Sequence, residues 1–168
     1  PLSNPGSIPT SSDGIRVPGN ANIDEAERQR RIDRDFQPYH VEIESRIRTH
    51  PKDGPPLALI SIHSFTPVMD GFQRPWHVGV LWDQDQRLSA PVIRELRRDT
   101  ELVVGENQPY TGSNPAGYAL DIHAADNGLP IAVLEIRQDL IETQEGADRW
   151  AYIIATAVSP ALKDYGHG

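Results

Sequence analysis

The fold of this chain is most strongly constrained by an alternation of short apolar runs with segments of helical periodicity. The apolar runs predict four strands, at residues 57–62, 77–82, 101–104 and 129–136. Helical patterns occupy residues 89–98, 118–128 and about 143–162. Strands that alternate with helices predict a layered α/β domain with a mostly parallel sheet.

The first 50 residues follow a different pattern. Residues 1–20 are rich in proline and glycine and predict an extended irregular segment. Residues 22–50 predict an amphipathic helix, capped by Asn22 with Glu25 three residues later. Pro38 should kink or split this helix near Phe36. Its apolar stripe comprises Ile32, Phe36, Tyr39 or His40, Ile43 and Ile47.

Composition limits the classes of function. A length of 168 residues fits a single domain that spans residues 1–168. The sequence has no cysteine, which excludes disulfides and thiolate metal sites. A net charge of -8 argues against a nucleic-acid partner. No apolar run approaches the roughly 18 residues of a membrane span, and no signal peptide is visible. We therefore expect a cytoplasmic protein with a small-molecule ligand and no membrane partner.

Two ionisable residues stand near the ends of predicted strands. His63 follows the run at residues 57–62, and Glu135 is the next-to-last residue of the run at residues 129–136. Ligands of open α/β sheets bind beyond the carboxyl ends of the strands. Neutral imidazole is a good zinc ligand, and a carboxylate beside a metal-bound water can accept its proton. Each residue also has a structural alternative, a hydrogen-bonded histidine or an ion-paired glutamate.

Established short motifs do not decide between these alternatives. The sequence has no HExxH pair, so a complete zinc site cannot be derived from it. It also has no G-x-S-x-G motif and no glycine-rich phosphate loop. Metal-assisted chemistry and simple ligand binding therefore stay open.

Several longer blocks carry a resemblance to known enzymes. "IHSFTP" and "LEIRQD" resemble the segments of zinc carboxypeptidases that hold a metal-binding histidine and the catalytic glutamate. The closer resemblance is to the N-formylglutamate amidohydrolase family. It rests on "SDGIRVPGN", "YH", "SIHSFTPVMDGFQRPWHVGVLWDQD", "VGENQPY" and "LEIRQDLI". The resemblance implies a three-layer α/β/α fold of the phosphorylase/hydrolase type with a mixed, mostly parallel sheet.

The resemblance also implies roles for individual residues. His63 would be a ligand of one zinc ion, and Glu135 would be the catalytic base. Substrate contacts would come from Arg74, Trp76, His77, Asn107, Tyr110 and Arg137. For most of these residues a structural role stays open: core packing for Trp76, a strand start for His77, and turn formation for Asn107 and Tyr110. Arg137 would orient Glu135, bind a substrate carboxylate or form an ion pair, and we expect His123 to be a surface or structural residue.

The chain departs from the family pattern at its start. Relatives carry an N-terminal segment with further metal ligands and a substrate-binding arginine, and no such segment precedes Pro1. We therefore expect the chain to correspond to the C-terminal two-thirds of the enzyme, as a truncation, a proteolytic product or a natural fragment. An uncovered sheet edge or apolar face should follow. We expect a homodimer through that surface, association with the missing segment, or marginal stability.

Two hypotheses for function remain. In the first, the protein is a metal-dependent hydrolase that cleaves the amide bond of an N-acyl amino acid such as N-formylglutamate. In the second, it is a non-catalytic ligand-binding or assembly module that retains the fold without a complete metal site.

Overall fold

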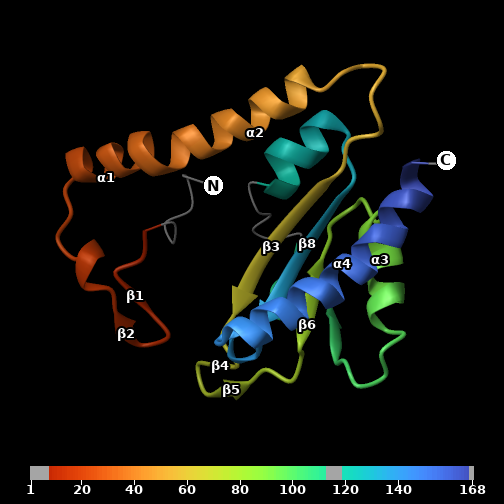
Figure 1. Ribbon diagram of the computed structural model, residues 1–168. Helices are drawn as coiled ribbons and strands as arrows, with labels where there is room; N and C mark the ends of the chain where they lie inside the picture. The colour runs from red at the N-terminus through yellow and green to blue at the C-terminus, as the bar shows by residue number, and fades with distance from the viewer. Residues whose placement is uncertain (1–7, 113–118, 167–168) are drawn as a thin grey trace. The chain divides into compact units, whose positions relative to one another are not determined.

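The computed structural model describes residues 8–112 and 119–166 (Figure 1). The chain divides into two compact units, Pro1–Gly54 and Pro55–Gly168, which we describe separately. The expectation of one domain over residues 1–168 stays a prediction. Within the described parts of the chain, no helix combines the length and the apolar character needed to cross a membrane.

The N-terminal unit begins with a small hairpin where the sequence predicts an irregular segment. Strands β1 (Ser11–Ser12) and β2 (Ile15–Arg16) pair antiparallel. The two residues between them, Asp13 and Gly14, have φ values of 51° and 71°. An Asp-Gly pair adopts this left-handed conformation readily and closes a tight hairpin. A 3-10 turn, η2 (Pro18–Asn20), follows.

A long helical segment follows as α1 (Glu25–Arg31), a π-helical turn η3 (Ile32–Phe36) and α2 (Gln37–Thr49). The prediction of Asn22 as the cap is wrong. Asp24 caps α1 and accepts a hydrogen bond from the Glu27 amide at 2.8 Å, whereas Asn22 has a φ of 60°. The expected irregularity before Pro38 is the π turn, in which the Gln37 amide donates to the Ile32 carbonyl. Proline disturbs the preceding turn because its ring crowds the carbonyl four residues earlier.

The stripe of the helical segment contains His40 in place of Tyr39. The Phe36 and His40 rings are 4.1 Å apart, and Tyr39 is 65% exposed. Ile32 is buried, and Ile43 and Ile47 are half-buried.

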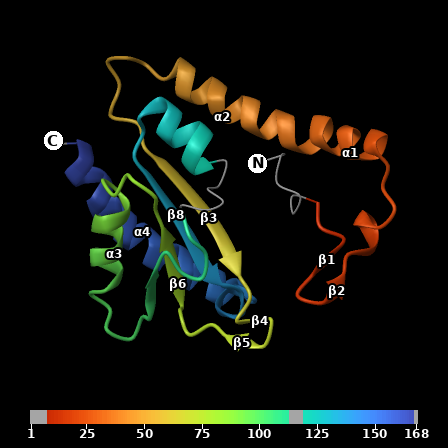
Figure 2. The ribbon, with the colours of Figure 1, turned by 180° about the vertical axis from the view of Figure 1, so that it is seen from behind.

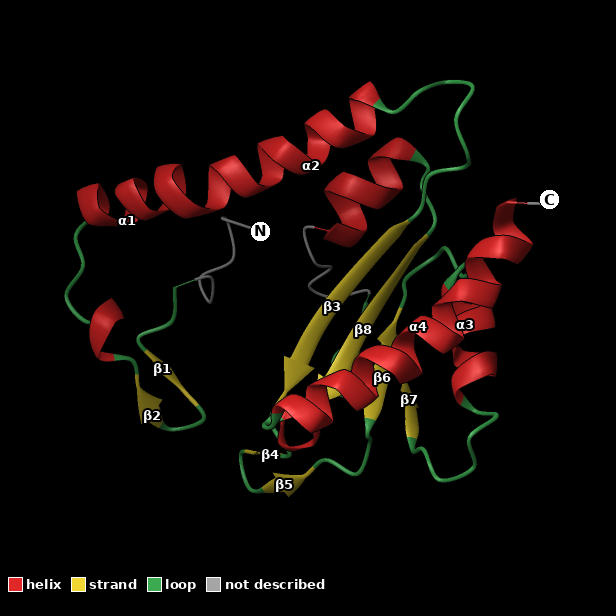
Figure 3. Cartoon of the chain, in the orientation of Figure 1, coloured by secondary structure: helices red, strands yellow, loops and turns green. Residues whose placement is uncertain are grey.

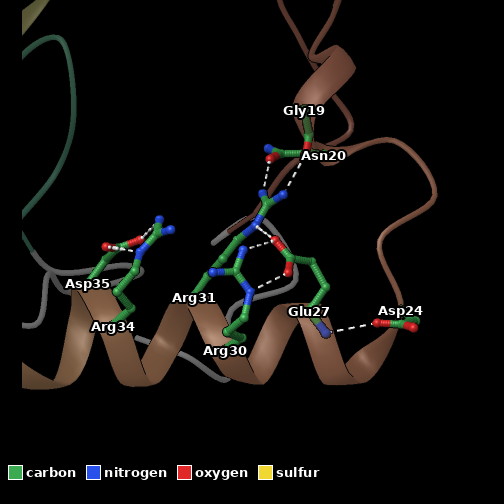
Figure 4. Close-up of polar contacts among 8 residues, drawn as sticks. All are labelled: Gly19, Asn20, Asp24, Glu27, Arg30, Arg31, Arg34 and Asp35. Carbon is green, nitrogen blue, oxygen red and sulfur yellow. Dashed lines mark hydrogen bonds and ion pairs between the residues drawn. The ribbon is translucent and has the colours of Figure 1, made fainter.

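Charged residues on α1 connect the helix to the preceding turn (Figure 4). Glu27 pairs with Arg30 at 2.6 Å and with Arg31 at 2.7 Å, and these arginines lower the pKa of Glu27 to about 2. Arg31 also donates to the Asn20 side-chain oxygen at 2.9 Å and to the Gly19 carbonyl at 2.8 Å. The charged side chains of Glu27, Arg30 and Arg31 therefore form their contacts within the N-terminal unit.

The C-terminal unit is built on a four-stranded sheet (Figure 3). Its strand order is β3 (Leu59–Phe65), β8 (Ile131–Arg137), β6 (Val78–Leu81) and β7 (Val104–Glu106). The β3–β8 and β6–β7 pairs are parallel, and the β6–β8 pair is antiparallel. A mixed, mostly parallel sheet is therefore confirmed.

The boundaries of the predicted strands and of helix α3 differ from those observed by a few residues. Strand β7 starts at Val104 instead of Glu101, because residues 99–102 form a turn in which Asp99 accepts bonds from the Glu101 and Leu102 amides. Helix α3 (Ser89–Leu96) is preceded by Leu88 as its cap, and Ser89 lies buried inside the first turn.

Helices flank both faces of the sheet, which gives the three layers (Figure 2). One face packs on α3 and α4 (Gln144–Gly166), and the sheet side chains in this core include Val80, Leu134 and Ile136. On the other face, Ala124 packs against Leu81, Ile131 and Val133. Ala124 closes the π turn η4 (Ala119–Ala124), which is followed by η5 (Ala125–Asn127) and ends at Gly128 with a φ of 65°.

Candidate active site

His63 and Glu135 are neighbours in the sheet. They are register partners in the parallel pair of β3 with β8, so their side chains emerge on the same face. Both strands continue for two residues beyond them, to Phe65 and Arg137, so neither residue is at the strand end itself. The face that they share is the one that Ala124 covers farther along the same strands.

Glu135 is a buried carboxylate. It is 7% exposed, and its Oε2 atom has no hydrogen-bond partner among the described residues. Burial raises the pKa of Glu135 to about 7, although the charge of Arg74 opposes this shift. A carboxyl group that changes protonation near neutral pH can accept and return a proton in catalysis.

His63 is exposed, because β3 is an edge of the sheet. Its Nε2 atom lies 2.9 Å from the Ser61 hydroxyl, two residues earlier on the same face of the strand. The pair therefore presents one solvent-accessible imidazole beside one enclosed carboxylate.

Two glycines allow the loop after β7 to pack closely against the sheet beside Glu135. Gly79 is the register partner of Glu135 on β6, and Gly105 is the partner of Gly79 on β7. A Cβ atom at Gly79 would overlap the Gln108 carbonyl, and one at Gly105 would lie 2.9 Å from the Trp76 ring. Sequence reasoning did not identify these glycines, although glycine inside a buried strand indicates a close approach by another segment.

The loop after β7 is held by Asn107. This residue has a φ of 48°, and its side-chain oxygen accepts from the Trp82 amide at 3.0 Å and from the Gly112 amide at 3.2 Å. Its amide oxygen is thus engaged in shaping the loop. Tyr110, three residues after Asn107, places its hydroxyl 3.3 Å from an Arg74 nitrogen.

Two other candidates are engaged by neighbouring protein groups. The His77 Nδ1 atom accepts from the Val103 amide at 3.0 Å, and burial lowers the pKa of His77. Arg137 pairs with Asp139 at 2.7 Å and lies 3.4 Å from the Trp76 carbonyl. Trp76 is half-buried against Gly105, and His123, predicted to be a surface or structural residue, is buried.

The His, Asp and Glu side chains of the described residues do not by themselves form a zinc site. Residues 8–112 and 119–166 contain no group of three or more His, Asp or Glu side chains that could hold a metal ion. A catalytic zinc normally takes three protein ligands. His63 alone would supply one.

The mixed sheet flanked by helices is consistent with an α/β fold of the hydrolase type, and it encloses the Glu135 carboxylate on one face. The family model for N-formylglutamate amidohydrolase matches residues 1–142. The chain belongs to this family.

Solved structures agree with this assignment. The crystal structure of the gene product Atu2144 from Agrobacterium tumefaciens aligns with a TM-score of 0.86 and 31% identity, over 98% of this chain and 65% of that chain. The crystal structure of N-formylglutamate amidohydrolase from Ralstonia eutropha JMP134 aligns with a TM-score of 0.55 and 20% identity, over 84% of this chain and 55% of that chain. The chain thus spans less than two-thirds of each of these structures. A search of curated proteins gives no match.

Proposed function

We propose that the protein carrying this chain hydrolyses the amide bond of an N-acyl amino acid, with N-formylglutamate as the first substrate to test. The observation that carries the proposal is the enclosed carboxylate of Glu135, which lies beside His63 in the register of the sheet. Family membership supports the choice of substrate.

Glu135 would act as a general base and then as a general acid. Its carboxylate takes a proton from water as the water oxygen attacks the formyl carbon. The protonated Glu135 then gives this proton to the amide nitrogen, the carbon–nitrogen bond breaks, and formic acid and the free amino acid leave. A pKa of about 7 suits both transfers, because neither protonation state is strongly favoured near neutral pH. Trp76 and Tyr110 are the proposed contacts at the rim of the site.

Zinc dependence is part of the proposal. His63 would provide one imidazole ligand, and the remaining ligands would come from outside the described residues. Metal content tests this directly: we expect about one zinc per protein molecule, lost in His63→Ala and retained in His50→Ala. Full zinc content in His63→Ala would remove His63 from this role.

Turnover should depend on the carboxylate of Glu135. Glu135→Gln keeps the shape of the side chain and removes its basicity, so formate release should fall by about 10²- to 10⁴-fold. Glu101→Gln, at an exposed position in the turn before β7, is the matched control and should keep wild-type turnover. Wild-type turnover in Glu135→Gln would exclude Glu135 as the base.

One observation favours the second candidate function, a non-catalytic binding or assembly module. It is the lack of a three-ligand metal group in the described parts of the chain. A protein that binds N-formylglutamate, takes up no zinc and releases no formate would establish this second function.

A further inference from the structure

Met69 carries the one sulfur atom of the chain, because the sequence has a single methionine and no cysteine. It ends the short strand β4 (Val68–Met69), which pairs antiparallel with β5 (Phe72–Gln73). The two residues between these strands, Asp70 and Gly71, are exposed, and Met69 itself is half-buried. Its thioether is therefore accessible to small solutes from the hairpin side.

The sulfur of Met69 contacts the guanidinium of Arg74. The Arg74 Nη2 atom lies 2.7 Å from this sulfur. A thioether is only a weak hydrogen-bond acceptor. Arg74 is 8% exposed, so little water can reach its guanidinium. The contact thus joins an oxidisable sulfur to a buried positive charge.

Arg74 connects the hairpin to the candidate active site. Its Nη1 atom lies 3.3 Å from the Tyr110 hydroxyl, and its guanidinium carbon lies 5.2 Å from the centre of the Tyr110 ring. The charge of Arg74 also acts on Glu135, where it lowers the pKa against the larger effect of burial. A shift of Arg74 would therefore disturb the loop that carries Tyr110 and change the electrostatic environment of Glu135.

We propose that Met69 is a site of reversible oxidation by peroxides, and that its sulfoxide displaces Arg74 and slows turnover. A sulfur lone pair attacks one oxygen of hydrogen peroxide, and the oxygen–oxygen bond breaks. The departing hydroxide takes the proton of the transferred oxygen, so the thioether is oxidised to a sulfoxide and the peroxide is reduced to water. The effect on turnover rests on the proposed function, whereas the oxidation and the displacement do not.

The distance between sulfur and nitrogen gives the reason for the displacement. A guanidinium nitrogen and an oxygen acceptor need about 2.7–3.2 Å between them. The sulfur of Met69 already lies at 2.7 Å from Nη2, so an oxygen added on that side requires the two side chains to separate. The sulfoxide is also far more polar than the thioether, and we expect Arg74 to follow its oxygen and leave Tyr110.

The test treats the protein with hydrogen peroxide and follows mass, formate release and thermal unfolding. The wild type should gain one oxygen atom, located at Met69 by fragment-ion mass spectrometry. Formate release from N-formylglutamate should fall by roughly 10- to 100-fold, because a small misplacement near a reacting centre is costly. The midpoint of unfolding should fall by about 2–4 °C. Methionine sulfoxide reductases should reverse these changes.

Three variants separate this site from general oxidative damage. Met69→Leu keeps an apolar side chain of similar volume without sulfur, so peroxide should change neither its mass nor its formate release. Adding Tyr152→Met to that variant places a sulfur at a position on α4 that is 74% exposed, and this protein should gain an oxygen without losing formate release. Met69→Gln places a polar acceptor beside Arg74 and should reproduce the loss without peroxide.

The displacement of Arg74 is tested by unfolding alone. In Arg74→Gln no guanidinium is left to displace, so oxidation of Met69 should leave the midpoint unchanged. If Arg74→Gln does not fold, Arg74→Lys serves in its place and should show a smaller fall than the wild type, because it lacks the planar donor group. An equal fall in the wild type and in the Arg74 variant would overturn the displacement.

The outcomes distinguish this inference from the proposed function. A protein that releases no formate contradicts the hydrolase, and a fall in the unfolding midpoint that depends on both Met69 and Arg74 would still support the inference. An oxidised wild type with an unchanged midpoint and unchanged formate release would overturn it. Resistance of Met69 to peroxide at concentrations that oxidise free methionine would overturn it as well.

Discussion

At the scale of the residue, the burial of Glu135 links stability to pH. Its pKa is raised from 4.5 to about 7 in the folded protein. Its contribution to stability is therefore complete below pH 4.5 and is lost as the pH rises through 7. Relative to wild type, Glu135→Gln should gain up to about 3 kcal/mol of unfolding free energy between pH 4.5 and 8. Urea unfolding of both proteins across this range measures the gain, and a pH-independent difference would contradict the raised pKa.

Individual residues of the site differ in how far the sequence predicts them. His63 and Glu135 could be identified because an ionisable residue near the end of an apolar run is unusual. The sequence does not show that they are register partners, since register depends on contacts between distant strands. The contact of Arg74 with Tyr110 is equally hidden, because the two residues lie 36 positions apart in the sequence.

At the scale of the element, Gly79 lets the loop after β7 pack on the sheet. Gly79→Ala would place a methyl group against the Gln108 carbonyl and force the loop away. We expect a loss of about 1–3 kcal/mol of unfolding free energy, measured by urea unfolding. Gly166→Ala is the control, because a Cβ atom there meets no neighbour within 4 Å. Wild-type stability in Gly79→Ala would show that the packing of the loop does not depend on a glycine at this position.

The N-terminal cap gives a second prediction at this scale. Asp24→Ala removes the acceptor of the Glu27 amide and should cost about 1 kcal/mol of helix stability. Asn22→Gly should be close to neutral, because glycine tolerates the left-handed conformation of that residue. Helix content by circular dichroism during thermal unfolding distinguishes the two, and a larger effect at Asn22 would restore the sequence-based assignment of the cap.

Element type was easier to predict than element boundaries. The long apolar run of β8 and the 23-residue helix α4 follow from hydrophobic pattern, because burial on the sheet determines both. The start of β7 depends on a side chain, since Asp99 closes a turn that an apolar pattern cannot indicate. The hairpins at Asp13-Gly14 and Asp70-Gly71 were missed, although Asp-Gly is a recognised hairpin signal.

At the scale of the whole molecule, the C-terminal unit has an unprotected edge. Strand β3 pairs with β8 alone in the described parts of the chain, and Ile62 on it is 59% exposed. A hollow of about 480 Å³ lies beside this strand and is lined by apolar side chains, including Ile60, Ile62, Ile136, Trp150, Ile154 and Val158. Edge strands usually carry charges or prolines that prevent pairing with other chains, and the sequence of β3, LISIHSF, has neither lysine nor proline.

The 168-residue chain on its own should therefore self-associate through β3. Pairing of two edges satisfies unpaired backbone groups and removes apolar surface from water, and both effects favour association. Light scattering coupled to size exclusion should show a mass that rises with protein concentration. Ile62→Lys places a charge on the edge and should shift the population to monomer, whereas Tyr152→Lys, at an exposed aromatic on α4, should not. A wild-type chain that stays monomeric at all concentrations and binds no apolar dye would show that this edge is already protected, and it would leave Ile62 without the role assigned to it.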